Sequence, residues 1–139
     1  MLTTQPKTHI TGVHTVGIPV TDQDLALTFY VETLGFEKRI EAAYGTGERW
    51  IEVAPPGATT TIALIAAAAG DPPVIDTRAA LLRAVRFMTD DAAAAHADLL
   101  ARGVDVDAEV TRWGGPMPPM FTFRDPDANL LLIVERASA

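Results

Sequence analysis

Two stretches of the chain repeat the same order of apolar and polar positions. Residues 13–20 and 84–88 are β-rich, and each run leads into Thr and Asp. These residue types favour helix N-termini because their side-chain oxygens accept hydrogen bonds from exposed backbone N–H groups. Apolar side chains then recur with helical spacing over about residues 23–34 and 92–102. The pattern therefore predicts a strand followed by a helix, twice.

The two stretches are copies of one unit. The separation between Thr21 and Thr89 is 68 residues and equals that between Gly35 and Gly103. Both glycines directly follow the expected helices, where a left-handed residue ends a helix at little cost. We therefore expect an internal repeat of two modules.

Three short strand-like runs follow each expected helix. They cover residues 36–43, 48–54 and 59–65 in the first half, and residues 104–111, 119–124 and 130–135 in the second. Each half is thus a βαβββ module, at about residues 10–66 and 81–136. Residues 67–80 are expected to form a flexible connector, because Pro72 and Pro73 provide no backbone donors for a β-ladder.

Eight short strands and two helices predict an α+β fold. Two helices cannot cover both faces of a parallel sheet, so we expect two curved, mainly antiparallel sheets. If each sheet carries its helix on the convex face, the concave faces line a cup-shaped cavity, which suggests a small-molecule ligand. The length of 139 residues fits one domain made of both modules.

Composition argues against several classes of function. The 18 acidic and 11 basic residues give a net charge of −7, which disfavours nucleic acids and anionic membranes as partners. The longest apolar run, residues 62–69, is too short to cross a bilayer, and the first 12 residues lack an apolar signal core. We therefore expect a cytoplasmic protein. The absence of cysteine excludes disulfides, thiolate nucleophiles and cysteine-based metal sites.

Several short motifs resemble the vicinal oxygen chelate superfamily. They are the run at residues 16–22, Phe29-Tyr30 followed by Leu34-Gly35-Phe36, the run at residues 50–53, and the closing residues 123–129. This superfamily contains glyoxalases, extradiol dioxygenases, methylmalonyl-CoA epimerases, fosfomycin-modifying enzymes and bleomycin-binding resistance proteins. The resemblance covers about residues 10–136 and implies the fold of paired modules. It does not fix the activity, because one fold hosts many chemistries.

In the metal-dependent members, the resemblance implies one ligand from the first strand and one from a later strand of each module. The matching positions here are Thr15, Glu52, Ala84 and Leu132. Only Glu52 binds a metal well, so no metal cofactor is expected. A divalent metal held by His14 and Glu52 is the alternative. Because side chains alternate along a strand, however, His14 faces away from the cup if Thr15 faces into it.

Arg86 is a second candidate for chemistry in the cup. It lies two residues after Ala84 and therefore shares the face of the missing ligand. A guanidinium among apolar residues needs a partner, and Glu52 or an anionic substrate group would supply one. Alternatively, Arg86 lies at a sheet edge and reaches solvent.

Large apolar side chains offer the walls of a ligand pocket. The loop at residues 113–120 combines them with glycines and prolines, and Tyr44 and Trp50 would add aromatic surface. Alternatively, this loop packs over the core. The candidate ligand-binding residues are Thr15, Trp50, Arg86, Trp113, Met117 and Met120.

Three functions are consistent with these features. The first is a metal-free protein that binds a small, partly apolar molecule in each cup, like the drug-sequestering members. The second is a lyase, isomerase or dioxygenase with an unrecognised metal site, or with Glu52 as general base and Arg86 stabilising an enolate-like anion. The third is a structural or regulatory protein with a filled cup. We expect a homodimer, because sheet edges need covering and superfamily members commonly close their cups by pairing.

Overall fold

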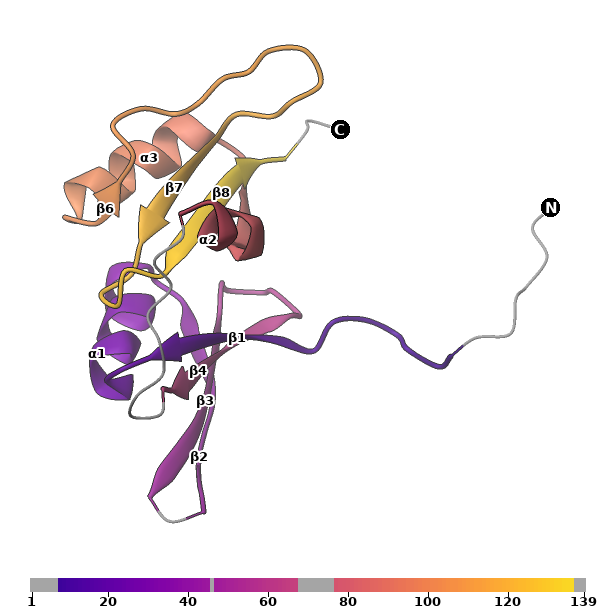
Figure 1. The fold of residues 1–139 in the computed structure, drawn as a ribbon, viewed down its shortest axis with the longest axis vertical. Helices are drawn as coiled ribbons and strands as arrows, with labels where there is room; N and C mark the ends of the chain where they lie inside the picture. Colours follow the sequence, from indigo (N-terminus) through magenta and orange to yellow (C-terminus); the bar gives the residue numbers. More distant parts are fainter. Residues whose placement is uncertain (1–7, 46, 68–76, 137–139) are drawn as a thin grey trace.

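A computed structural model of the chain describes residues 8–45, 47–67 and 77–136, and contains two sheets of four strands each (Figure 1). The first half comprises β1 (Thr15–Val20), α1 (Gln23–Leu27), η1 (Thr28–Thr33), β2 (Glu37–Tyr44), β3 (Glu48–Ala54) and β4 (Thr61–Ala66). The second comprises α2 (Thr77–Arg83), β5 (Val85–Thr89), α3 (Ala92–Ala101), β6 (Asp105–Val106), β7 (Met120–Arg124) and β8 (Leu130–Glu135). The predicted α+β fold is confirmed.

The two sheets have the same topology. Their strand orders are β1-β4-β3-β2 and β5-β8-β7-β6. In each sheet the first strand pairs in parallel with the last strand of its module, and the other pairs are antiparallel. The sheets are therefore mainly antiparallel, as the sequence predicts, and β1 and β5 each lie at a sheet edge.

The predicted helix signals have their expected roles. Asp22 accepts hydrogen bonds from two backbone N–H groups at the start of α1, at 2.9 and 3.1 Å, and Asp91 accepts one from α3 at 3.0 Å. Gly35 and Gly103 both have a φ of 80°, which is the left-handed conformation that glycine adopts most readily. The repeat in the sequence is thus a repeat of capped helices.

The first helix differs from the sequence expectation. Instead of one α-helix over residues 23–34, α1 passes into η1, which is a π-helix. A π-helix is stabilised by hydrogen bonds from residue i+5 to residue i, such as that from the Leu34 N–H to the Phe29 carbonyl at 2.9 Å. The apolar spacing of a dozen residues is compatible with both helix types, so the sequence pattern could not distinguish them.

Two other segments differ as well. The expected connector includes α2, while residues 68–76 of that connector lie outside the described part of the chain. The expected strand at residues 104–111 shortens to β6. Its regular pairing ends at Asp107, whose carboxylate accepts hydrogen bonds from the backbone N–H and hydroxyl of Thr122 at 2.8 and 2.7 Å. A side chain that takes over a ladder donor in this way ends the strand.

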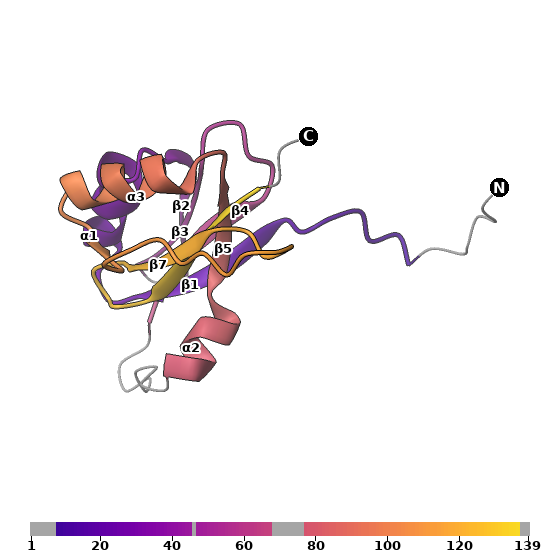
Figure 2. The ribbon, with the colours of Figure 1, turned by 90° about the horizontal axis from the view of Figure 1, so that it is seen from above.

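The two modules share one hydrophobic core on the sides of the sheets that carry α1, η1 and α3. Buried residues from both modules contribute, including Tyr30, Ile51 and Phe121. The rings of Phe36 and Phe87 also meet across the modules, with centroids 5.4 Å apart. Helices α1 and α3 lie on the same side of the molecule, whereas α2 lies apart from them (Figure 2). Within the described residues, no helix is long and apolar enough to span a membrane.

Candidate functional site

The strands of the first sheet present one face to the hydrophobic core, and the opposite face lies outside that core. In β3, Ile51 and Val53 belong to the core, so Trp50 and Glu52 lie on the opposite face. The register places Glu52 between Ile40 of β2 and a residue of β4. We call this surface the open face of the first sheet.

The second sheet is arranged in the same way. Phe87 of β5 packs against the core, and Arg86 therefore lies on the other face. Its neighbour across the ladder is Leu132, which in turn pairs with Thr122. Helix α2 contacts β8 and supplies the Leu81 carbonyl to Arg86, so it covers part of this surface. We call this surface the open face of the second sheet.

Glu52 is held by two neutral hydrogen-bond donors. The Thr61 hydroxyl donates to Oε1 at 2.7 Å, and the Trp50 indole Nε1–H donates to Oε2 at 2.7 Å. The hydrogen bond from Thr61, then that from Trp50, lowers the pKa of the Glu52 carboxyl against the opposing effect of burial. The carboxylate is therefore ionised at neutral pH, and both of its oxygens have protein partners.

The four positions that match a metal site do not fit one. The Thr15 hydroxyl donates to the Thr61 carbonyl at 3.1 Å, while Ala84 and Leu132 are buried hydrocarbon side chains. Only Glu52 offers a strong ligand atom, and it is 3% exposed. Within the described residues, no group of three or more metal-binding side chains lies close enough together to hold an ion.

His14 lies one residue before β1 and is exposed. Its carbonyl accepts the Thr61 N–H at 3.0 Å. Its electrostatic interaction with Glu52 is the weakest of the effects that lower the pKa of the Glu52 carboxyl. His14 and Glu52 are thus electrostatic neighbours, but they do not form part of a larger cluster of ligands among the described residues.

Arg86 does not pair with Glu52 in this structure. Its guanidinium is exposed and donates to the backbone carbonyls of Ala84, at 3.1 Å, and Leu81, at 3.5 Å. Its strand, β5, is the edge strand of the second sheet. This arrangement corresponds to the alternative in which Arg86 reaches solvent at a sheet edge.

The candidate apolar wall is exposed. Trp113 is 65% and Met117 is 51% exposed, while Met120 at the start of β7 is half-buried. On the first sheet, the rings of Tyr44 and Trp50 meet edge to face, with centroids 6.5 Å apart. The loop at residues 113–120 therefore does not simply pack over the core, and the aromatic pair lies beside Glu52.

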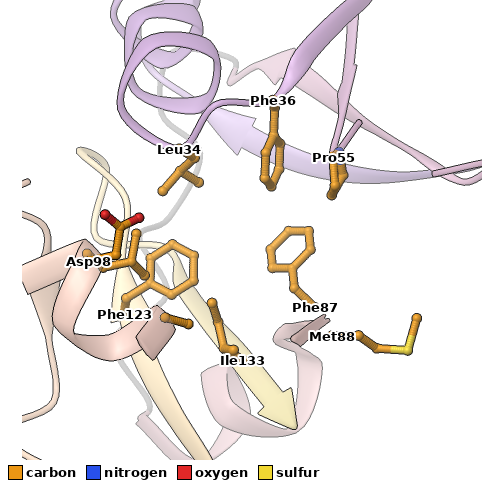
Figure 3. A pocket seen from close by; sticks show the side chains of 10 residues that line it. Leu34, Phe36, Pro55, Phe87, Met88, Asp98, Phe123 and Ile133 are labelled. Atoms are coloured by element: carbon orange, nitrogen blue, oxygen red, sulfur yellow. The ribbon is translucent and has the colours of Figure 1, made fainter. Parts of the chain in front are cut away.

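One cavity was not anticipated from the sequence. It has a volume of about 160 Å³ and lies between the modules on the core side (Figure 3). Leu34 and Phe36 line it from the first module, and Phe87, Phe123 and Ile133 line it from the second. Strand alternation identifies such residues as core, but it carries no signal for incomplete packing where two modules meet.

Comparison with known proteins gives consistent matches over almost the whole chain. The sequence profile of the Glyoxalase/Bleomycin resistance protein/Dioxygenase superfamily matches residues 12–133. The crystal structure of TnmS3, an antibiotic binding protein from Streptomyces sp. CB03234, is 34% identical with a TM-score of 0.76, and the match covers 94% of this chain and 100% of that chain. A superfamily member from Sphaerobacter thermophilus DSM 20745 is also 34% identical, with a TM-score of 0.71 and coverage of 91% and 98%. The uncharacterized protein YetH of Bacillus subtilis (strain 168) is 27% identical over 128 residues, which are 91% of this chain and 99% of YetH.

Proposed function

We propose, because this chain belongs to the Glyoxalase/Bleomycin resistance protein/Dioxygenase superfamily, that it binds a small, partly apolar molecule and does not transform it. The observation that carries the proposal is the similarity to TnmS3. That protein is described as antibiotic binding, and its 34% identity to this chain extends over its whole length. A drug-like molecule, held and thereby sequestered, is the ligand class that this similarity supports.

The chemistry of the open faces supports binding without a metal. Ala84 and Leu132 supply no ligand atoms, and both oxygens of Glu52 already accept hydrogen bonds. A metal ion would have to displace the Thr61 and Trp50 donors from the Glu52 carboxylate. The four family positions therefore disfavour coordination of a divalent ion.

We also propose that two copies of the chain close the cup. The open face of the first sheet exposes Ile40, Tyr44 and Ile65, which are 42%, 50% and 38% exposed. The second module exposes Met88, at 74%, and Trp113, at 65%. A second copy would cover this apolar area, whereas the net charge of −7 disfavours a nucleic acid or an anionic membrane as the partner.

The contacts argue against the enzymatic alternative in which Glu52 is a general base. Efficient proton transfer at neutral pH favours a base with a raised pKa and access to the carbon acid. The pKa of Glu52 is lowered, and its side chain is 3% exposed. Arg86, the expected partner for a developing anion, does not contact it.

A binding and turnover experiment tests the proposal. The purified protein is screened against a panel of small antibiotics by calorimetry, and the recovered compounds are analysed by mass spectrometry. We expect at least one compound to bind stoichiometrically and to be recovered unchanged, and light scattering to give the mass of a dimer. Conversion of the bound compound would contradict a purely binding role. A monomer at all concentrations would contradict the shared cup.

A further inference from the structure

We infer that Glu52 is a positioning residue that holds the Trp50 indole as a fixed aromatic platform, and that the ligand carries a flat aromatic ring that lies on it. The inference rests on the proposed binding function and names the class of ligand. Glu52, which occupies a metal-ligand position of the family, thus has a different role in this chain. The aromatic platform consists of the Trp50 indole and the adjacent Tyr44 ring.

A chain of hydrogen bonds fixes the Trp50 indole. Trp50 and Glu52 are two residues apart on β3 and therefore share the open face of the first sheet. The carboxylate binds the indole N–H at 2.7 Å through one oxygen and the Thr61 hydroxyl at 2.7 Å through the other. Hydrogen bonds to an ionised group are stronger than those between neutral groups, so both contacts restrict the carboxylate. The orientation of the indole is consequently set by residues of two adjacent strands.

Glu52 and Thr61 are less accessible to solvent than Trp50. Glu52 is 3% exposed and Thr61 is 7% exposed, so these side chains are covered. Trp50 is only half-buried, so part of this residue is exposed to solvent. A ligand that approaches the open face can therefore contact Trp50 more readily than the Glu52 carboxylate.

The Trp50 indole offers a ligand its ring surface and no free hydrogen-bond donor. Indole has a single N–H donor, and Glu52 already accepts it. The remaining surface is the π face and the apolar edge, which recognise a flat conjugated ring and do not require a hydrogen-bond acceptor on the ligand. The Tyr44 ring stands at 70° to the indole with centroids 6.5 Å apart, and Ile40 lies opposite Glu52 in the ladder. These neighbours extend the apolar surface of the aromatic platform.

The anchoring contact is tested by NMR of the indole N–H groups. The chain contains two tryptophans, so the variant Trp113→Phe assigns the Trp50 signal. We expect the Trp50 Nε1–H to exchange with deuterium at least about tenfold more slowly than that of exposed Trp113. Glu52→Gln and Thr61→Val should each shift the Trp50 signal and leave the Trp113 signal in place. The anchoring role would be overturned if the Trp50 N–H were not protected from exchange, or if neither substitution shifted its NMR signal.

The ligand class is tested with two neutral probes that share one skeleton, 2-naphthol and decahydro-2-naphthol. By calorimetry we expect the flat probe to bind at least about threefold more tightly, and Trp50→Leu to abolish this preference. Glu52→Gln should weaken binding of 2-naphthol by about threefold to tenfold. Glu37→Gln, which alters an exposed carboxylate in the same sheet, is the matched control and should have no effect. Thr61→Val provides a second route to the same loss if Glu52→Gln folds poorly.

The outcomes separate this inference from the proposed function. Equal binding of both probes, or binding of neither, would overturn the aromatic platform as the recognition element. The antibiotic screen and the mass spectrometry test the binding function independently of these probes. A bound antibiotic without a flat ring would likewise overturn the ligand class while supporting the binding function.

Discussion

The Tyr30 phenol donates a 2.8 Å hydrogen bond to Oδ2 of Asp125 and thereby joins η1 of the first module to the turn between β7 and β8 of the second. Tyr30 is fully buried, and Asp125 is 6% exposed. Asp125 also accepts hydrogen bonds from the backbone N–H groups of Asp127 and Asn129, both at 2.9 Å. Burial, followed by the negative charge of Asp125, raises the pKa of the Tyr30 phenol above its usual range, so this group remains a donor.

We expect Tyr30→Phe to lower the free energy of unfolding by about 1.5–3 kcal/mol, because it removes a hydrogen bond to a buried charged group. Urea unfolding of the purified protein measures this change. Tyr44→Phe is the matched control, since Tyr44 is 50% exposed, and it should cost less than about 0.5 kcal/mol. A similarly small cost for Tyr30→Phe would contradict the role of this hydrogen bond between the modules.

Glu52 should make stability depend on pH in the acid range. Its pKa in the folded protein lies below the ordinary value of 4.5, because the Thr61 and Trp50 donors stabilise the ionised form. The resulting stabilisation is fully present above the ordinary pKa and is lost as the pH falls through the folded value. We expect the free energy of unfolding of Glu52→Gln to fall less steeply than that of the unchanged protein between about pH 5 and pH 3.

Urea unfolding at a series of pH values provides the measurement. Glu37→Gln, at an exposed position in β2, should keep the slope of the unchanged protein. Parallel curves for the unchanged protein and Glu52→Gln would show that the carboxylate is not selectively stabilised by folding.

A double-mutant cycle tests whether Glu52 and Arg86 interact. Glu52 binds Trp50 and Thr61, whereas Arg86 binds backbone carbonyls of its own module. The changes in the free energy of unfolding caused by Glu52→Gln and Arg86→Met should therefore add to within about 0.5 kcal/mol. Arg86→Met alone should cost less than about 0.5 kcal/mol, since its guanidinium is exposed. A coupling above about 1 kcal/mol would mean that the two side chains meet, either within one chain or across two copies.

Protein purified without added metal should contain no stoichiometric transition metal. A metal that binds the folded state would raise its stability by mass action. Because Ala84 and Leu132 supply no ligand atoms, nickel, zinc, manganese or iron should give little increase in thermal stability. Elemental analysis and thermal melts provide the measurements. One equivalent of tightly bound metal that disappears in His14→Gln would contradict this prediction and support the site at His14 and Glu52.

The sequence by itself determined the features that depend on local order. Asp22 and Asp91 before the helices, and Gly35 and Gly103 after them, specify where helices begin and end through contacts within a few residues. Strand alternation likewise places Trp50 and Glu52 on one face, because successive side chains point to opposite sides of a strand.

Only the tertiary structure decided which side chains meet. Glu52 binds Thr61 because β3 lies beside β4 in the first sheet, whereas Arg86 belongs to an edge strand of the second. The hydrogen bond between Tyr30 and Asp125 joins residues 95 positions apart, and the cavity between the modules depends on how two packed surfaces fit. Such contacts follow from the order of strands and the docking of modules, and neither is encoded in the spacing of neighbouring residues.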